Sequence, residues 1–411
     1  MKKKYIIIIL TVILIVDSIL LILTFNKKKA TLLDEPIKEV NNKEQINIDN
    51  KDIITKELKY EFNKKIYINK IIETDSEERL DTTELGTHEL LVTDKNNITY
   101  NLKYTIVDTK KPLIMGGTTK TTTLGKKINL VNKYLCGDNH DDKPKCYIEG
   151  EYDINKVGTY DLLYVAEDSS GNKNTKKIKL KVVEPKPKSS STSTSKPKKR
   201  TSIKTYIKKY KKENTKIGID VSAWQNNINW KKAKKAGVEF AMLRIGYGHT
   251  SENKIMMDKQ FQNNLKGAKE AKVPIGLYFY SYAKTKKDAE DQANWIVKQL
   301  NGQKLDLPIA FDWENWNSFN KYGVSFKTLS DIAQTFIDTV EKHGYKGMLY
   351  SSAYYLKNIW DDFDNTWVAY YTSNNDFSKP YIMWQLSSSG QVDGISGSVD
   401  MDILYENKNE H

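Results

Sequence analysis

The chain has 411 residues, of which 39% are hydrophobic and 11% aromatic. This composition suits roughly two to four folded domains and excludes a wholly disordered protein. The formal net charge is +13, but residues 216–411 carry 23 basic and 23 acidic side chains and residues 30–183 carry 25 and 26. The excess charge therefore lies in two short segments, 1–29 and 184–215. A nucleic-acid-binding protein carries such charge on a folded face, so no nucleic-acid partner is expected.

The N-terminal segment contains an apolar run of 21 residues, 5–25. This is about the length of helix that crosses a bilayer. The run is followed by Asn26 and three lysines rather than by the small residues of a signal-peptide cleavage site. We therefore expect residues 1–29 to be an uncleaved, single-pass membrane anchor.

Two stretches before residue 184 resemble each other. Residues 84–108 and 156–184 both run from Gly-Thr through alternating apolar residues and an Asp-containing turn into a second alternating segment. Such a repeat predicts antiparallel strands and two β-sandwich units, 30–107 and 108–184. The second unit, with the segments DTKKPLI, LGKKINL and AEDSSGN, resembles bacterial immunoglobulin-like surface repeats. That resemblance implies an architecture rather than an activity.

Two cysteines, Cys136 and Cys146, are the only ones in the chain. Their spacing matches no standard zinc pattern, and a local disulfide in an exported domain is the preferred interpretation. A metal site that includes His140, and two free thiols, remain alternatives.

Residues 185–214 are rich in Ser, Thr, Pro and Lys. Their composition predicts an unfolded linker. Its positive charge suits either an extended tether or binding to anionic wall polymers.

Residues 215–411 alternate between strand and helix patterns, which predicts an α/β barrel. Eight strands are expected, at 217–221, 238–245, 273–280, 307–313, 346–350, 367–371, 381–386 and 398–403. Helices are expected at 229–236, 258–271, 285–300 and 325–343, with a short one near 352–359. The predicted fold is therefore multidomain: a transmembrane helix, two immunoglobulin-like β-sandwich units, and a flattened TIM-like barrel of eight strands and about five helices.

Four acidic residues stand at predicted strand ends, where the chemistry of a parallel barrel gathers. They are Asp220, Asp312, Glu314 and Asp400. Asp312 and Glu314 are two residues apart, so they share one face of their strand and each shifts the pKa of the other. A protonated carboxyl beside an ionised one is what cleavage of a glycosidic bond requires. Any one of these acids, taken alone, is more typical of a surface loop or a helix cap.

Aromatic residues near the same strand ends provide flat faces on which sugars stack. The candidates for substrate binding are Trp224, Tyr278, Tyr280, Tyr350 and Trp384. Each ring, taken alone, is more typical of a packed core. The chain has no Gly-rich phosphate loop, no HExxH motif and no GxSxG elbow, so neither a cofactor nor a metal is expected.

Five segments closely resemble the lysozymes of glycoside hydrolase family 25. They are GIDVSAWQ (218–225), VPIGLYFYSYA (273–283), LPIAFDWE (307–314), GMLYSS (347–352) and MWQLSSSGQVDGISGSVDMD (383–402). The resemblance implies an N-acetylmuramidase that cleaves the β-1,4 bond between N-acetylmuramic acid and N-acetylglucosamine in peptidoglycan. By the same resemblance, Glu314 is the general acid and Asp312 its neighbouring carboxylate. Asp220 and Asp400 are the acids of the opening and closing motifs, and Asp402 stands where the family commonly has Asn.

The resulting hypothesis is a membrane-anchored wall hydrolase whose barrel lies outside the cell, with the two β-units as spacers and peptidoglycan strands as its partner. One alternative is a wall-binding scaffold that has lost turnover. Another is a hydrolase of chitin or a different β-1,4 glycan. The presence of all four acids favours an enzyme over a scaffold.

Overall fold

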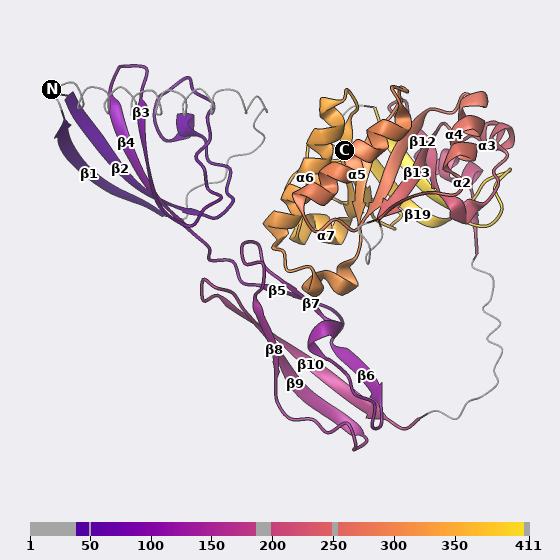
Figure 1. Ribbon diagram of the computed structural model, residues 1–411, viewed down its shortest axis with the longest axis horizontal. Helices are drawn as coiled ribbons and strands as arrows, with labels where there is room; N and C mark the ends of the chain where they lie inside the picture. Colours follow the sequence, from indigo (N-terminus) through magenta and orange to yellow (C-terminus); the bar gives the residue numbers. More distant parts are fainter. Residues whose placement is uncertain (1–37, 49–50, 186–198, 249–253, 407–411) are drawn as a thin grey trace. The chain divides into compact units, whose positions relative to one another are not determined.

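The structure is a computed structural model that describes residues 38–48, 51–185, 199–248 and 254–406. The chain divides into two compact units, Met1–Thr109 and Lys110–His411 (Figure 1). The predicted anchor helix at 5–25 lies outside the described residues. Within the described part, no helix is long and apolar enough to cross a bilayer.

The described residues of the first unit form one four-stranded sheet in the order β1-β2-β4-β3. Its elements are β1 (Lys38–Ile48), β2 (Lys51–Glu61), η1 (Ile68–Lys70), β3 (Gly86–Thr93) and β4 (Thr99–Val107). The buried side chains of β4, Leu102, Tyr104 and Ile106, pack against Ile68 and Leu80 from the segment between β2 and β3. Among the described residues this segment takes the place of a second sheet, so the predicted sandwich is not found in this unit.

The second β-unit occupies the start of the second compact unit and has two sheets. A four-stranded sheet has the order β6-β10-β9-β8, and β5 pairs with β7. The elements are β5 (Leu113–Met115), β6 (Thr119–Thr123), η2 (Val131–Lys133), β7 (Leu135–Gly137), β8 (Lys145–Glu149), β9 (Gly158–Glu167) and β10 (Lys173–Val183). The two sheets enclose one core, which includes Ile114, Cys136, Tyr164 and Leu180. Cys136 and Cys146 form a disulfide, which was the preferred of the three interpretations left open by the sequence.

The two β-units share an arrangement of strands, of which the sequence repeat predicted only the hairpins. The predicted hairpins are present as the antiparallel pairs β3–β4 and β9–β10. In each unit, however, the second hairpin strand also pairs with an earlier strand in parallel, β2 with β4 and β6 with β10. The expectation of purely antiparallel sheets was therefore wrong, because local alternation does not reveal the direction of a partner that is distant in the sequence.

The barrel consists of eight strands closed on themselves, as predicted. They are β12 (Thr215–Val221), β13 (Phe240–Gly248), β15 (Ile275–Ser281), β16 (Ile309–Trp313), β17 (Gly347–Ser352), β18 (Thr366–Ala369), β19 (Met383–Gln391) and β20 (Val399–Tyr405). Neighbouring strands from β12 to β19 are parallel, whereas β20 is antiparallel to both β12 and β19 and closes the barrel between them. Two short strands, β11 (Thr201–Ser202) and β14 (Ile255–Met257), pair with β19 and β13.

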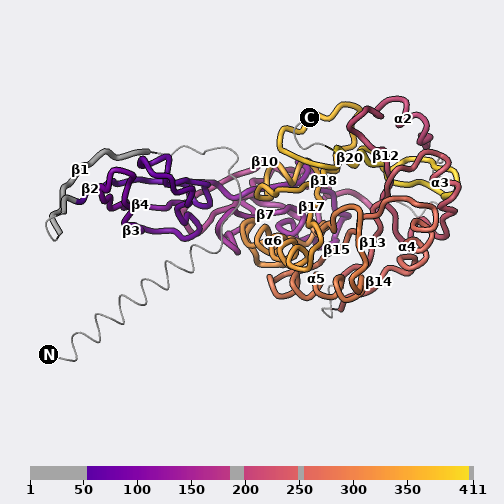
Figure 2. The backbone as a smooth tube through the Cα atoms, turned by 90° about the horizontal axis from the view of Figure 1, so that it is seen from above, coloured from indigo at the N-terminus to yellow at the C-terminus, as the bar shows by residue number. Residues whose placement is uncertain are grey.

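Helices α4, α5 and α6 lie on the outside of the barrel (Figure 2). Helix α4 packs on β13 and β15, and α6 packs on β16 and β17. The elements are η3 (Ala223–Gln225), α3 (Trp230–Ala236), α4 (Phe261–Glu270), α5 (Lys286–Leu300), η4 (Trp316–Lys321), α6 (Phe326–Lys342) and α7 (Ala353–Asn358). The longest helix, α6, begins after the N-cap Ser325, whose side chain accepts from the Thr328 N–H. Its apolar face packs on the barrel through Phe336, which contacts Phe311 of β16 at a ring separation of 5.2 Å.

The second half of the predicted linker is folded. Helix α2 (Ile203–Tyr210) follows β11 and packs on the barrel. Ile203, Tyr206, Ile207 and Tyr210 recur at helical spacing and face the barrel core. The Tyr206 hydroxyl donates to Ser387 Oγ at 2.9 Å. The basic composition obscured this apolar stripe, and the prediction of a linker that extends to residue 214 was wrong.

Candidate active site

The alternation of side chains along the strands explains why acids gather inside one end of the barrel. On β16, Ile309, Phe311 and Trp313 belong to the layer between strands and helices, whereas Ala310 lies in the barrel interior. Asp312 follows Ala310 on the same interior face, one layer nearer the carboxyl end. Glu314 comes directly after the strand and lines the same pocket.

The four predicted acids line one pocket of about 430 Å³. Asp220 reaches it from the carboxyl end of β12 and Asp312 from that of β16. Asp400 was also expected at a carboxyl end, but it lies near the amino end of β20. Because β20 is antiparallel to its neighbours, its amino end lies at the same rim, and Asp400 is the register partner of Asp220.

Asp220 belongs to a network of buried polar groups. Its Oδ2 accepts a hydrogen bond of 2.8 Å from Gln385 Nε2, and the Gln385 Oε1 accepts from the hydroxyls of Tyr350 and Tyr371, both at 2.9 Å. Burial, and then the charges of Asp400 and Asp402, raise the pKa of Asp220 well above its usual value. The network fixes the Asp220 carboxyl on the floor of the pocket.

Asp402, which sequence reasoning did not place in the site, lies two residues further along the interior face of β20 and is fully buried. The Trp367 Nε1 donates to its Oδ1 at 2.9 Å. Among the described residues its Oδ2 has no donor, but Asp220 lies within hydrogen-bonding reach. Two carboxylates cannot donate to each other, so a contact between them requires that one retains a proton. Burial, and then Asp400, raise the pKa of Asp402, which fits a retained proton.

Asp312 is buried at the centre of the pocket wall. Among the described residues, no group donates to its Oδ1. Burial and the nearby charge of Glu314 raise the pKa of Asp312 well above its usual value, and Arg244 opposes this effect. Arg244 itself is held by Asp258, whose Oδ2 accepts from both Nε and Nη2 at 2.7 Å. The arginine therefore provides a fixed positive charge beside the acids.

Glu314 lies at the mouth of the pocket. Its side chain is open to solvent in the pocket, yet protein atoms surround it on most sides. This partial desolvation, together with the charge of Asp400, raises the pKa of Glu314. A carboxyl that keeps its proton while remaining accessible is suited to donate that proton to a substrate.

Four of the five predicted aromatic residues line the pocket. Trp224, on η3, is 81% exposed at its rim. Tyr278 and Tyr280 of β15 and Tyr350 of β17 form parts of its wall. Trp384 does not line it: the ring is buried in the layer outside the barrel, and its Nε1 donates to the Tyr370 carbonyl at 2.7 Å. The alternation along β19 turns Gln385 inward instead, so the structure does not support a substrate-binding role for Trp384.

Several pocket residues were missed because no local motif marks them. Arg244, Trp367, Tyr371 and Gln385 all line the pocket. A usable signal for Arg244 was its position on the interior face of β13, two residues after Met242, since a charged side chain facing a barrel interior requires a polar partner. Gln385 and Trp367 depend on how β18, β19 and β20 are aligned, which a single sequence does not reveal.

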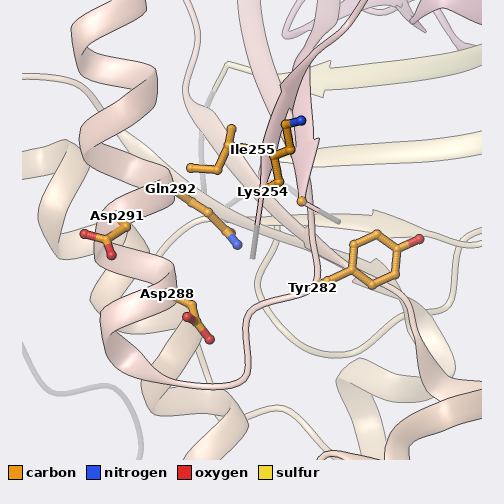
Figure 3. Close-up of a pocket in the computed structure, with 7 residues that line it drawn as sticks. Lys254, Ile255, Tyr282, Asp288, Asp291 and Gln292 are labelled. Carbon is orange, nitrogen blue, oxygen red and sulfur yellow. The ribbon is translucent and has the colours of Figure 1, made fainter. Parts of the chain in front are cut away.

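A second pocket, near α5 and β14, does not show comparable chemistry (Figure 3). It measures about 40 Å³, far below the roughly 300 Å³ or more of typical ligand sites. Its acids have structural partners: Asp288 accepts from the Lys284 and Thr285 N–H groups at the start of α5, and Asp291 pairs with Lys287. The 430 Å³ pocket is therefore the candidate active site.

Comparison with known proteins identifies the family. Residues 219–395 match the model of Glycosyl hydrolases family 25. The uncharacterized protein YegX of Escherichia coli O157:H7 is 30% identical over 200 residues, which cover 47% of this chain and 71% of the relative. The autolytic lysozyme of Clostridium acetobutylicum is 29% identical over 196 residues, 46% of this chain and 56% of the relative.

A solved structure with similarity to the chain is the modular autolysin LytC from Streptococcus pneumoniae, in complex with a synthetic peptidoglycan ligand. It has a TM-score of 0.43 and 26% sequence identity, and the match covers 59% of this chain and 56% of that one. The chain thus spans about half the length of this autolysin and of the autolytic lysozyme. The match to the family model coincides with the barrel that carries the acidic pocket, and the chain belongs to glycosyl hydrolase family 25.

Proposed function

We propose that this glycoside hydrolase is a lysozyme that cleaves the β-1,4 bond between N-acetylmuramic acid and N-acetylglucosamine in peptidoglycan. The observation that carries the proposal is the meeting of Asp220, Asp312, Glu314 and Asp400 in one pocket, with an accessible Glu314 whose pKa is raised. The similarity to the autolytic lysozyme of Clostridium acetobutylicum supports the same substrate class.

In the proposed mechanism, Glu314 donates its proton to the oxygen of the leaving sugar. The bond between that oxygen and the anomeric carbon breaks, and water later adds to this carbon and returns a proton to Glu314. In the transition state, positive charge grows on the other sugar ring. Those of the remaining acids that are ionised stabilise this positive charge. Their attraction to it is stronger in a partly desolvated pocket than in water. Arg244 opposes the rise in the pKa of Asp312 and so favours the ionised form of this carboxyl. The proton associated with Asp220 and Asp402 prevents an excess of buried negative charge.

The aromatic residues at the rim and wall of the pocket favour binding of a glycan over binding of a small hydrophilic substrate. Trp224 presents most of its surface to solvent beside the acids, where its flat face is suited to stack on a sugar ring. Tyr278, Tyr280 and Tyr350 add hydroxyl groups and apolar edges along the wall. We assign these residues to substrate binding.

Residues 1–29 are proposed to anchor the protein in the bacterial cell membrane, with one span and the remaining domains outside. The support is the apolar run at 5–25 and the position of the proposed substrate. The Cys136–Cys146 disulfide also suits an oxidising outer compartment. The second β-unit is proposed to be an immunoglobulin-like surface module, and the basic segment 185–198 a tether with affinity for anionic wall polymers.

Purified peptidoglycan provides the test. The full chain is incubated with it, and the new reducing ends are identified by mass spectrometry, with Glu314→Gln as the inactive control. Reducing N-acetylmuramic acid ends are expected. Reducing N-acetylglucosamine ends would indicate cleavage of the other glycosidic bond. Cleavage of chitin oligosaccharides without cleavage of peptidoglycan would show that the substrate is a different β-1,4 glycan. Binding to peptidoglycan without any new reducing ends would show that the protein is a wall-binding scaffold.

A further inference from the structure

A loop of the second β-unit lies against the barrel at the segment that follows Glu314 in the chain. This docking loop comprises residues 134–142, and it contacts the barrel at η4 and at the start of α6. The Asn320 side chain of η4 makes two hydrogen bonds to it: the Cys136 N–H donates to Oδ1, and Nδ2 donates to the Tyr134 carbonyl, both at 3.0 Å. One side chain thus joins η4 to the edge of β7.

The docking loop also satisfies the amino end of α6. A helix begins with N–H groups that have no partner within the helix. Here the N–H of Phe326 donates to the Asp138 carbonyl at 2.8 Å and that of Lys327 to the Asn139 carbonyl at 3.3 Å. Asp142 Oδ1 accepts from the Ser325 N–H at 2.6 Å and from the Thr328 hydroxyl at 3.1 Å. Without the loop, these donors would need other acceptors.

Close packing accompanies the hydrogen bonds. Gly137 lies so near the barrel that a Cβ atom there would be 2.6 Å from ring atoms of both Phe319 and Phe326. Met115 and Leu135 of the second β-unit belong to the same apolar cluster as the outer layer of the barrel. The Cys136–Cys146 disulfide ties the docking loop to β8. The interface is therefore part of the core rather than a loose contact between tethered modules.

The contact lies on the C-terminal side of the proposed acid, in the stretch of chain that leads from Glu314 to α6. The Trp316 N–H donates to the Glu314 carbonyl at 2.7 Å, and the Trp316 ring lies 4.8 Å from that of Trp313. From Glu314 the chain passes through η4, held by Asn320, and reaches α6, held by Asp142. Movement of η4 would therefore be transmitted to the backbone of Glu314.

We propose that the docking loop is a positioning element of the active site, which fixes residues 314–328 and thereby the direction of the Glu314 side chain. The part of this inference that concerns catalysis rests on the proposed function. It also changes the expected role of the second β-unit, which the sequence suggested to be only a spacer. Asp142 and Asn320 are the positioning residues.

The test uses the full chain with the double substitution Asp142→Ala and Asn320→Ala. Asp142→Asn is the conservative variant, because its carbonyl oxygen still accepts from Ser325 and Thr328. Asp161→Ala is the matched control, since Asp161 lies on β9 and pairs with Lys179 at the surface. Hydrogen exchange of the amides at 314–328 and kcat and KM on soluble peptidoglycan fragments are measured for each.

The double variant is expected to exchange faster at 314–328 and to lose about 10-fold to 100-fold in kcat, the usual effect of misplacing a catalytic group by about 1 Å, with KM changed less than about twofold. Asp142→Asn and Asp161→Ala should behave as wild type. If the double variant does not fold, the single variants Asp142→Ala and Asn320→Ala are measured in the same way, and a smaller effect is expected from each.

Unchanged exchange would show that the docking loop does not fix this segment. Faster exchange with an unchanged kcat would show that it does not position Glu314. A loss in Asp142→Asn equal to that in the alanine variants would assign the effect to charge rather than to the contact. A wild-type chain that cleaves no peptidoglycan would overturn the proposed function, and the exchange measurement would still decide whether the loop holds residues 314–328.

Discussion

Glu314 and Asp312 are two residues apart, but they occupy different surroundings. Asp312 is buried in the pocket wall beside Arg244, whereas Glu314 is open to the pocket. Burial raises the pKa of both, yet only Glu314 combines a retained proton with access to a substrate. This difference supports the assignment of Glu314 as the acid.

Replacement of Glu314 by Gln keeps the size of the side chain and removes its acidic proton. We expect kcat on peptidoglycan fragments to fall by about 10² to 10⁴, the usual contribution of general acid catalysis. The thermal unfolding temperature should not fall, because the side chain lies in an open pocket. A folded Glu314→Gln protein with near-wild-type turnover would show that another residue donates the proton.

The pH dependence of turnover should report the charge of Asp400. Because Asp400 raises the pKa of Glu314, its replacement by Asn lets Glu314 lose its proton at lower pH. The basic limb of the kcat profile should therefore move to lower pH. Asp393→Asn, an exposed acid in the turn between β19 and β20, is the control and should leave the profile in place. An unmoved basic limb in Asp400→Asn would argue against Glu314 as the group that titrates.

The buried pair Asp220 and Asp402 predicts a pH-dependent stability. A carboxyl whose pKa is raised in the folded state keeps its proton longer than in the unfolded chain, so stability is lost as pH rises from the unfolded value, about 3.9, through the folded one. Asp402→Asn removes the part of this loss that comes from Asp402, and its amide can donate to Asp220.

We expect Asp402→Asn to raise the stability at pH 8 by about 1 to 3 kcal/mol, the usual cost of an unsatisfied buried polar group, and to have less effect at pH 4. Thermal unfolding at the two pH values measures the difference, again with Asp393→Asn as control. A gain that is equal at both pH values, or a loss of stability at pH 8, would contradict a shared proton.

Asp220, Asp312 and Glu314 could be located from the sequence because their placement follows from local rules. Asp400 was placed by the same rules, but it reaches the pocket from the amino end of the antiparallel strand β20. Side chains alternate along a strand, and the loops of a parallel barrel begin at the carboxyl ends. The role of Asp402 could not be located in this way. Its contact with Asp220 depends on the register in which Asp402 pairs with Gly218 and Gln385, and these partners are distant in the sequence.

At the scale of elements, the barrel strands and helices were predicted within a few residues, but α2 was not. Its sequence is dominated by lysines, and the apolar positions Ile203, Tyr206, Ile207 and Tyr210 become visible as a stripe only when read at a period of 3.6 residues. Composition measured over a whole segment averages this stripe away. Tertiary packing on β19 and β12, rather than helix propensity, accounts for the stability of such a short helix.

Truncation of Ile203 tests whether α2 is an integral part of the barrel. Its side chain is 2% exposed, so Ile203→Ala should reduce the free energy of unfolding by about 2 to 5 kcal/mol. Lys204→Ala, one residue further on the exposed face, should change it by less than about 0.5 kcal/mol. Denaturant unfolding of the full chain, followed by tryptophan fluorescence, measures both. Equal stability of the two variants would show that α2 is not packed on the barrel.

At the scale of the whole molecule, the two β-units differ in their relation to the barrel. The first belongs to a separate compact unit, Met1–Thr109, with its own apolar core. The second belongs to the same compact unit as the barrel and shares apolar packing and hydrogen bonds with η4 and α6. The sequence repeat made the two units look equivalent, because the docking loop 134–142 acquires its function from a tertiary contact that no repeat pattern records.

This difference predicts that two deletions will have different effects on the rate with soluble substrate. Removal of residues 38–107, which contain the first sheet, should leave kcat/KM on soluble peptidoglycan fragments within about twofold of wild type, because the core of the barrel is untouched. Digestion of intact wall by the anchored protein should fall, because the deletion shortens the distance that the barrel can extend from the membrane. A strand of 11 residues such as β2 is roughly 35 Å long.

Removal of residues 110–183 should lower the rate on both substrates, because it exposes Phe319 and Phe326 and removes the acceptors of the α6 N–H groups. The two deletions are compared in the same membrane preparation, with the amount of folded protein normalised for each. Loss of the soluble-substrate rate on removal of 38–107 would show that the first unit also supports the active site. An unchanged soluble-substrate rate on removal of 110–183 would instead make both units spacers and contradict the role of the docking loop.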